Sequence, residues 1–249
     1  MKTICSLRGV TLAAALLASA GIASVDIALA DEATLAAGAG FRRPLAEVAT
    51  AYEKASSNKI LQIYGHMGQV IAQARESGQI ALVCGDQSVL KDAKGVSFER
   101  FARLGLGKLV VAYRKGVNLA KAEDIAGDSV KRVGTPDQAN AIYGKAGRQF
   151  LERARLIDKI EPKLVKVGTV PQVTSYVISG EVDAGFVNAT DAIGAGANIG
   201  GFVEVKSDLY DSVEVSCGAV AGKMTKAAEG FVAFLATPQA REILARYGL

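Results

Sequence analysis

Histidine and tryptophan are almost missing from this 249-residue chain, which has one histidine, His66, and no tryptophan. Zinc sites need several histidine, cysteine or carboxylate ligands, so one histidine disfavours a catalytic zinc centre. The sequence also has no Gly-x-Ser-x-Gly turn for a hydrolase nucleophile and no phosphate-loop motif. Aromatic residues are only 6% of the chain, which disfavours an aromatic-lined sugar or nucleobase site. We therefore expect a protein that is not an enzyme and needs no cofactor.

A strong charge of either sign is also missing. The chain has 29 basic and 25 acidic residues, a formal net charge of +4. An excess this small does not indicate nucleic-acid binding, but it is compatible with an anionic ligand. After residue 30, no run is long and apolar enough to predict a transmembrane helix.

The first 30 residues have the order of features that is typical of a secretory leader. Lys2 and Arg8 make a basic start, residues 10–23 are apolar, and Ala28-Leu29-Ala30 offers a small-residue cleavage site. We predict a signal peptide over residues 1–30, cleaved near Ala30, and a mature protein that works outside the cytoplasm. Its remaining cysteines, Cys84 and Cys217, can pair in an oxidising compartment or stay free.

Short apolar runs alternate with amphipathic ones along the rest of the chain, which predicts an α/β class with mixed, mostly parallel sheets. Strands are predicted at residues 33–39, 59–64, 80–84, 106–113, 132–134, 164–167, 183–187 and 213–220. Helices are predicted around residues 45–52, at 68–77, up to about 155, at 171–179 and over 226–247 with a break at Pro238. We expect residues 31–112 plus 212–249 to form lobe 1 and residues 113–211 to form lobe 2. The crossings are then near Tyr113-Arg114 and Tyr210-Asp211.

Four glycine-containing turns, each between a predicted strand and a predicted helix, are the candidate ligand loops. They lie at residues 38–41, 65–68, 134–141 and 168–171. Glycine lets a backbone approach a ligand closely, and the helix that follows presents free N–H groups and a positive dipole end. This combination suits a small anion in a cleft between two lobes.

Two further groups of residues allow more than one interpretation. Arg42 and Arg43 could clamp an anion or lie solvated at the start of a helix. His66, Met67 and Cys84 could hold a soft metal such as cuprous copper. They could equally be a loop histidine, an apolar methionine and a buried cysteine.

Several segments resemble the periplasmic molybdate-binding proteins of ABC transporters in order and spacing. They are residues 34–51, 59–73, Val133-Gly134-Thr135-Pro136, 160–167, 179–192 and 240–248. The resemblance implies a type II periplasmic-binding fold, with two α/β lobes that close on an oxyanion, and a membrane permease as partner. It also implies that Ala141 and Val170 offer backbone N–H groups. Where the family has hydroxyl donors, this chain has Gly40, His66 or Met67, and Asn188.

Together these observations predict a periplasmic solute-binding protein that captures a small anion between its lobes and delivers it to a permease. We expect His66 and Asn188 to donate hydrogen bonds in place of the substituted hydroxyls, and the chain to be a monomer. The expected cleft residues are Gly40, Phe41, His66, Met67, Ala141, Val170 and Asn188. The alternatives are a soft metal or an organic acid bound through His66 and Met67, and a sensor that does not transport.

Overall fold

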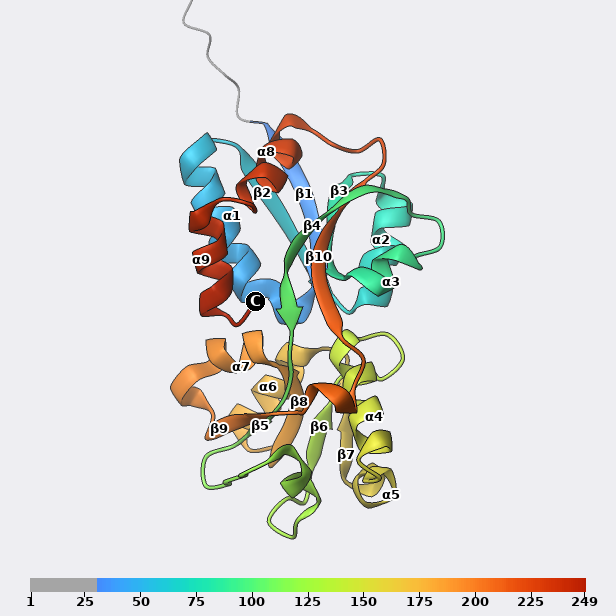
Figure 1. Cartoon of the computed structure of the whole chain (residues 1–249), viewed down its shortest axis with the longest axis vertical. Coiled ribbons are helices and arrows are strands. Elements are labelled where there is room, and N and C mark those ends of the chain that lie inside the picture. The colour runs from blue at the N-terminus through green and yellow to red at the C-terminus, as the bar shows by residue number, and fades with distance from the viewer. Residues whose placement is uncertain (1–30) are drawn as a thin grey trace, which may run out of the picture.

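The computed structural model describes residues 31–249, so the predicted signal peptide and its cleavage site lie outside the described residues. Two lobes stand one above the other and are joined by two chain crossings (Figure 1). Each lobe has a five-stranded sheet with helices packed on it, which confirms the predicted two-lobed α/β class. Over residues 31–249, none of the helices has the length and apolarity to cross a bilayer.

The first lobe is built on a sheet whose middle strand is fully buried. In spatial order the strands are β2 (Lys59–Gly65), β1 (Glu32–Gly38), β3 (Ile80–Asp86), β10 (Val213–Val220) and β4 (Phe98–Gly107). Four of them run in one direction and only β10 runs against them. Its helices are α1 (Arg42–Ser56), α2 (Met67–Ser77), α3 (Gln87–Lys91), α8 (Lys226–Phe234) and α9 (Pro238–Arg246).

The second lobe repeats the same strand arrangement. Its sheet runs in the order β7 (Leu164–Lys166), β6 (Val133–Thr135), β8 (Ala184–Asn188), β5 (Leu109–Tyr113) and β9 (Gly201–Glu204). Here β5 is the strand that runs against the other four. The helices are α4 (Ile142–Arg153), α5 (Ile157–Ile160), α6 (Val170–Ser179) and α7 (Ala189–Ala195).

Local signals in the sequence place several helix boundaries correctly. Helix α2 ends at Gly78, whose φ of 63° is in the left-handed region that glycine adopts easily. Helix α9 starts at Pro238, and the hydroxyl of Thr237 accepts a hydrogen bond from the N–H of Ala240 at 3.3 Å. Proline is favoured in the first turn, where its missing N–H has no helical partner. The predicted break in the last helical region is therefore confirmed.

The prediction of one strand over residues 106–113 is wrong. Leu106 and Gly107 end β4 in the first sheet, whereas β5 starts at Leu109 and pairs with β8 and β9 in the second. The first crossing therefore lies at Gly107-Lys108 rather than near Tyr113-Arg114. An apolar run shows that a segment is buried, but it does not show to which sheet the segment belongs. Here the first part of the run belongs to the first sheet and the rest to the second. The sequence patterns also did not single out β9, α3, α5, α7 or most of β4.

The two cysteines of the described chain lie directly opposite each other on β3 and β10. Cys84 and Cys217 are bonded as a disulfide, which joins strands 133 residues apart in sequence. Both residues are buried, at 0% and 1% exposure. The pairing that the sequence left open is thus made inside the core of the first lobe.

Candidate functional site

The candidate site lies where the carboxyl ends of strands from the first lobe face helix N-termini from the second. In open α/β sheets, ligands bind outside the carboxyl ends of the strands. The cavity there measures about 20 Å³, the space that one water molecule needs. Its lining residues are Gly38, Ala39, Gly40, Phe41, Gly65, His66, Met67, Ala141, Ile142, Tyr143, Thr169 and Val170. Six of the seven predicted cleft residues are therefore brought together, and the exception is Asn188.

Three helices begin at this cavity. Helix α2 is capped by His66, whose Nδ1 accepts a hydrogen bond from the N–H of Gln69 at 3.3 Å. Helix α4 follows Ala141, which has no side-chain cap, and α6 follows Thr169. The N–H groups of a first turn have no partner inside their helix. The cavity is therefore surrounded by the positive ends of three helix dipoles, which favours an anion.

The donors at these helix ends differ in part from those implied by the resemblance. The N–H of Ala141 donates to the carbonyl of Asp137 at 2.9 Å, so it is already used within its own loop. Over residues 31–249, the N–H groups of Ile142 and Tyr143 in the first turn of α4 have no recorded hydrogen-bond partner. In α6, Pro171 has no N–H, which leaves Val170 as the donor that the resemblance implied.

Asn188 does not line the cavity but joins the two lobes beside it. It is fully buried at the end of β8, and its Nδ2 donates to the carbonyl of Gly40 at 2.9 Å. Its Oδ1 has no hydrogen-bond partner among residues 31–249. A Cβ atom added to Gly40 would lie 2.9 Å from that oxygen, so a larger residue at position 40 requires Asn188 to move. In this structure Asn188 makes a contact between lobes, and its role as a ligand donor stays a prediction.

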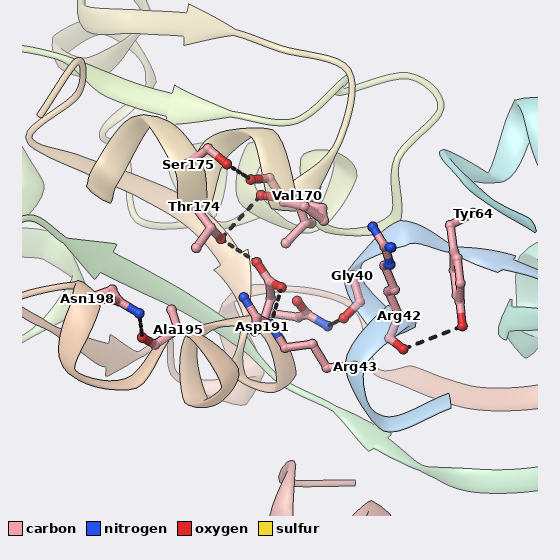
Figure 2. A network of polar contacts seen from close by, with 12 residues as sticks. Gly40, Arg42, Arg43, Tyr64, Val170, Thr174, Ser175, Asp191, Ala195 and Asn198 are labelled. Carbon is pink, nitrogen blue, oxygen red and sulfur yellow. Dashed lines mark hydrogen bonds and ion pairs between the residues drawn. The ribbon is translucent and has the colours of Figure 1, made fainter. Parts of the chain in front are cut away.

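Arg43 forms a second contact between lobes. Its Nε lies 3.4 Å from Oδ1 of Asp191, at the start of α7 (Figure 2). The Asp191 side chain is 5% exposed, and its other oxygen accepts a hydrogen bond from the hydroxyl of Thr174 on α6. The guanidinium of Arg42 lies 5.9 Å from the ring centroid of Tyr64 instead. Neither arginine lines the cavity of the candidate site, so the two form no clamp around it in this structure.

A carboxylate of the second lobe lies near His66. Asp137 accepts hydrogen bonds from the side chain of Asn140 at 3.0 Å and from the backbone N–H groups of Ala139 and Asn140. These bonds, with the side chain of Asn140 contributing most, hold the pKa of Asp137 below its usual value, and the charge of His66 adds to the effect. The loop that carries Asp137 therefore lies close to His66: a Cβ atom at Gly68 would lie 3.1 Å from Oδ1 of Asn140 and 3.3 Å from the His66 ring.

The structure does not support the metal-binding alternative that used Cys84. Because Cys84 is bonded to Cys217, it offers no thiolate ligand. Met67 is buried, and a Cβ atom at Gly38 would lie 3.5 Å from its sulfur, so the thioether packs against the end of β1. Within the described chain, no three His, Cys, Asp or Glu side chains are grouped to hold a metal ion.

Sequence reasoning missed Tyr143, which is one wall of the cavity. Its ring packs edge-on against Phe41 of the first lobe, with centroids 6.1 Å apart. Its hydroxyl is buried without a partner in the described chain, and burial raises its pKa. A Cβ atom at Gly107 would overlap this hydroxyl, so the first crossing passes directly beside it. Nothing in the sequence around Tyr143 distinguishes it from an ordinary core position of an amphipathic helix.

Comparisons with known proteins found a matching family and relatives of similar length. The family model described as bacterial extracellular solute-binding protein matches residues 33–249. The molybdate-binding protein ModA of Azotobacter vinelandii is 27% identical over 229 residues, which cover 89% of this chain and 90% of the relative.

Two solved structures show the same fold. The periplasmic molybdate-binding protein of Azotobacter vinelandii superposes with a TM-score of 0.79 at 24% identity, covering 87% of this chain and 97% of that one. The sulfate-binding protein SubI of Mycobacterium tuberculosis has a TM-score of 0.62 at 17% identity, covering 88% and 86%. The type II periplasmic-binding fold predicted from the sequence is confirmed.

Proposed function

The chain belongs to the bacterial extracellular solute-binding protein family, and from this premise we propose that it captures a small anion in the cleft between its lobes. The family consists of binding proteins of ABC transporters, so the chain is not an enzyme and its working partner is a membrane permease. We further propose that it acts in the periplasm as a monomer, after removal of residues 1–30 near Ala30. Closure of the lobes around the solute is then the signal to the permease.

One observation carries the choice of an anion: three helix N-termini surround the cavity, and among residues 31–249 neither a lysine nor an arginine lines it. The donors are backbone N–H groups of α2, α4 and α6, together with the imidazole of His66. Relatives named for molybdate and sulfate support the same ligand class. The proposed ligand contacts are made by Gly40, Phe41, His66, Met67, Ile142, Tyr143 and Val170.

The size of the cavity adds a condition on how the ligand enters. A tetrahedral oxyanion is larger than the single water molecule for which the cavity has space. Binding therefore requires the lobes to lie further apart around the ligand than they do here, with the contacts of Asn188 and Arg43 opening.

A thermal-shift screen of the mature chain tests the proposal directly. Molybdate, sulfate, phosphate and small carboxylates are added in turn, and the melting temperature is followed. A ligand at 100 times its dissociation constant stabilises the folded state by about 2.7 kcal/mol, which gives a clear shift. If none of these anions raises the melting temperature, the proposed anion capture is wrong.

The variant Ala141→Asp tests whether the anion binds in the cleft. An aspartate at this cap position accepts from the free N–H groups of α4 and so competes with a bound anion, while it stabilises the helix. We expect the variant to keep or raise its melting temperature and to lose the anion-induced shift. Ala141→Asn is the matched control, since it caps the helix without a charge and is expected to weaken the shift less. Unchanged anion binding in Ala141→Asp would place the ligand elsewhere.

A further inference from the structure

A groove of about 610 Å³ adjoins the cleft and shares Ile142 with it. Its walls are α2 and α3 of the first lobe and α4 of the second, which face each other on one side of the molecule (Figure 1). The volume is in the range of sites for small organic ligands. The charged residues that line the groove are Arg75, Asp86, Asp92, Lys94, Lys145 and Asp211.

Asp86 differs from the other carboxylates of this groove. It is 9% exposed, whereas Asp92 is exposed to solvent and Asp211 is paired with Arg153. One oxygen of Asp86, Oδ1, accepts from the N–H and the hydroxyl of Ser88 at 2.9 and 2.8 Å. Over residues 31–249, its Oδ2 has no recorded hydrogen bond, and no basic group lies within 4.0 Å of the carboxylate.

The position of Asp86 places this carboxylate beside the anion site. It is the last residue of β3, at the same carboxyl edge of the sheet where β1 ends at Gly38 and β2 at Gly65. A Cβ atom at the preceding residue, Gly85, would lie 3.7 Å from Cδ1 of Ile142, the residue that the cleft and the groove share. A carboxylate that is mostly withdrawn from water and has no cation beside it favours a cationic partner, which offsets part of the cost of its burial.

The two sites together present opposite charges to one ligand. The helix N-termini favour an anionic group in the cleft, and Asp86 favours a cationic group at the inner wall of the groove. We infer that Asp86 recognises an ammonium group of the cargo, which is therefore a small zwitterion rather than a bare oxyanion. This inference rests on the proposed capture of an anion and specifies the second functional group of that ligand.

Isothermal titration with two matched probes tests the role of Asp86. 2-Aminoethylphosphonate and ethylphosphonate carry the same phosphonate, and only the first has an ammonium group. We expect the mature chain to bind the amino compound about tenfold or more tightly, the effect of one hydrogen bond between charged groups. In Asp86→Asn this preference is lost, while ethylphosphonate binds as tightly as before or more tightly, because a negative charge beside the cleft has been removed. Asparagine caps α3 as well as aspartate does, so the variant keeps its fold, which its melting temperature checks.

Asp92→Asn is the matched control, because it removes a charge from the exposed rim of the same groove. We expect it to leave the preference between the two probes unchanged. Equal binding of both probes to the mature chain overturns the role of Asp86, as does a preference that survives in Asp86→Asn. Binding of molybdate or sulfate without either phosphonate overturns it as well, and leaves anion capture intact. If no anion of either kind binds, anion capture and the role of Asp86 both fail.

Discussion

The ion pair between Arg43 and Asp191 is expected to hold the two lobes closed. Arg43 belongs to α1 of the first lobe and Asp191 to α7 of the second, so the pair exists only when the lobes are together. Figure 2 shows how Thr174 supports Asp191 from the side opposite Arg43. Replacing Arg43 by alanine removes the only basic group that the structure places beside this carboxylate in the described residues.

The size of the effect follows from the burial of the two side chains. Breaking a fully buried ion pair costs about 3–5 kcal/mol. Here Asp191 is 5% exposed but Arg43 is 44% exposed, so water screens part of the interaction. We therefore expect Arg43→Ala to destabilise the closed form by about 1–2 kcal/mol, a factor of roughly 5–30 in the equilibrium between closed and open forms.

Two measurements follow this equilibrium. Small-angle X-ray scattering of the ligand-free protein should give a larger radius of gyration for Arg43→Ala than for the parent chain. The affinity for any anion that the parent binds should rise by up to the same factor of 5–30, because the closed ligand-free form has no space for an oxyanion and more molecules then occupy the open form that admits it. Arg42→Ala is the matched control, since that neighbouring arginine lies over Tyr64 of its own lobe and is expected to change neither quantity.

A double-mutant cycle separates the ion pair from other effects of the substitution. Asp191→Asn keeps an acceptor for the hydroxyl of Thr174 and removes the charge that Arg43 meets. The effects of Arg43→Ala and Asp191→Asn should therefore be far from additive, since both remove one interaction. Additive effects, or an unchanged radius of gyration in Arg43→Ala, would show that the pair does not control closure.

Three further predictions concern stability. The double variant Cys84→Ala/Cys217→Ala removes the disulfide and opens a loop of 133 residues. The free energy of unfolding, measured by urea unfolding, should fall by about 5 kcal/mol, the chain-entropy value for a loop of this length. A fall of less than about 1 kcal/mol would contradict this prediction. Burial alone would raise the pKa of Asp183, but the N–H groups of Arg132 and Lys131 and the side chain of Arg114 outweigh it and hold the pKa below its usual value. The ionised carboxylate therefore stabilises the folded chain at neutral pH. This stabilisation is lost as the pH falls below about 4, through the lowered folded-state pKa. Asp183→Asn should therefore be destabilised at pH 7 and approach the parent near pH 3, and a difference that is constant over this range would refute the assignment. The free energy of unfolding of His66→Ala should fall by about 0.5–2 kcal/mol, because α2 loses its cap. His66→Asn should keep a cap and the stability of the parent. Equal melting temperatures for the two variants would argue against the cap.

Much of the fold was predictable because it depends on local patterns. The apolar residues of α1 recur every three or four positions, and Leu45, Val48, Ala49 and Tyr52 are the ones that the structure buries. The breaks at Gly78 and Pro238 follow from backbone chemistry that acts within a few residues. The glycine turns before α2, α4 and α6 could likewise be recognised as candidate ligand loops.

The composition of the site depended on contacts that no local pattern contains. Asn188 was predicted to face the ligand, but it donates to Gly40 of the other lobe. Arg43 was considered as an anion clamp, but its partner Asp191 is 148 residues away in sequence. Tyr143 lines the cavity only because the crossing at Gly107 leaves space for its hydroxyl.

The sequence by itself determined the class of fold, most helix and strand positions and the presence of glycine turns at helix starts. These properties follow from hydrophobic periodicity and backbone preferences, which act over a few residues. Only the tertiary structure decided the sheet that Leu109–Tyr113 joins, the pairing of Cys84 with Cys217 and the state of Asp86. Each of these depends on which distant segments meet, and that is set by the packing of the whole chain rather than by any short stretch of it.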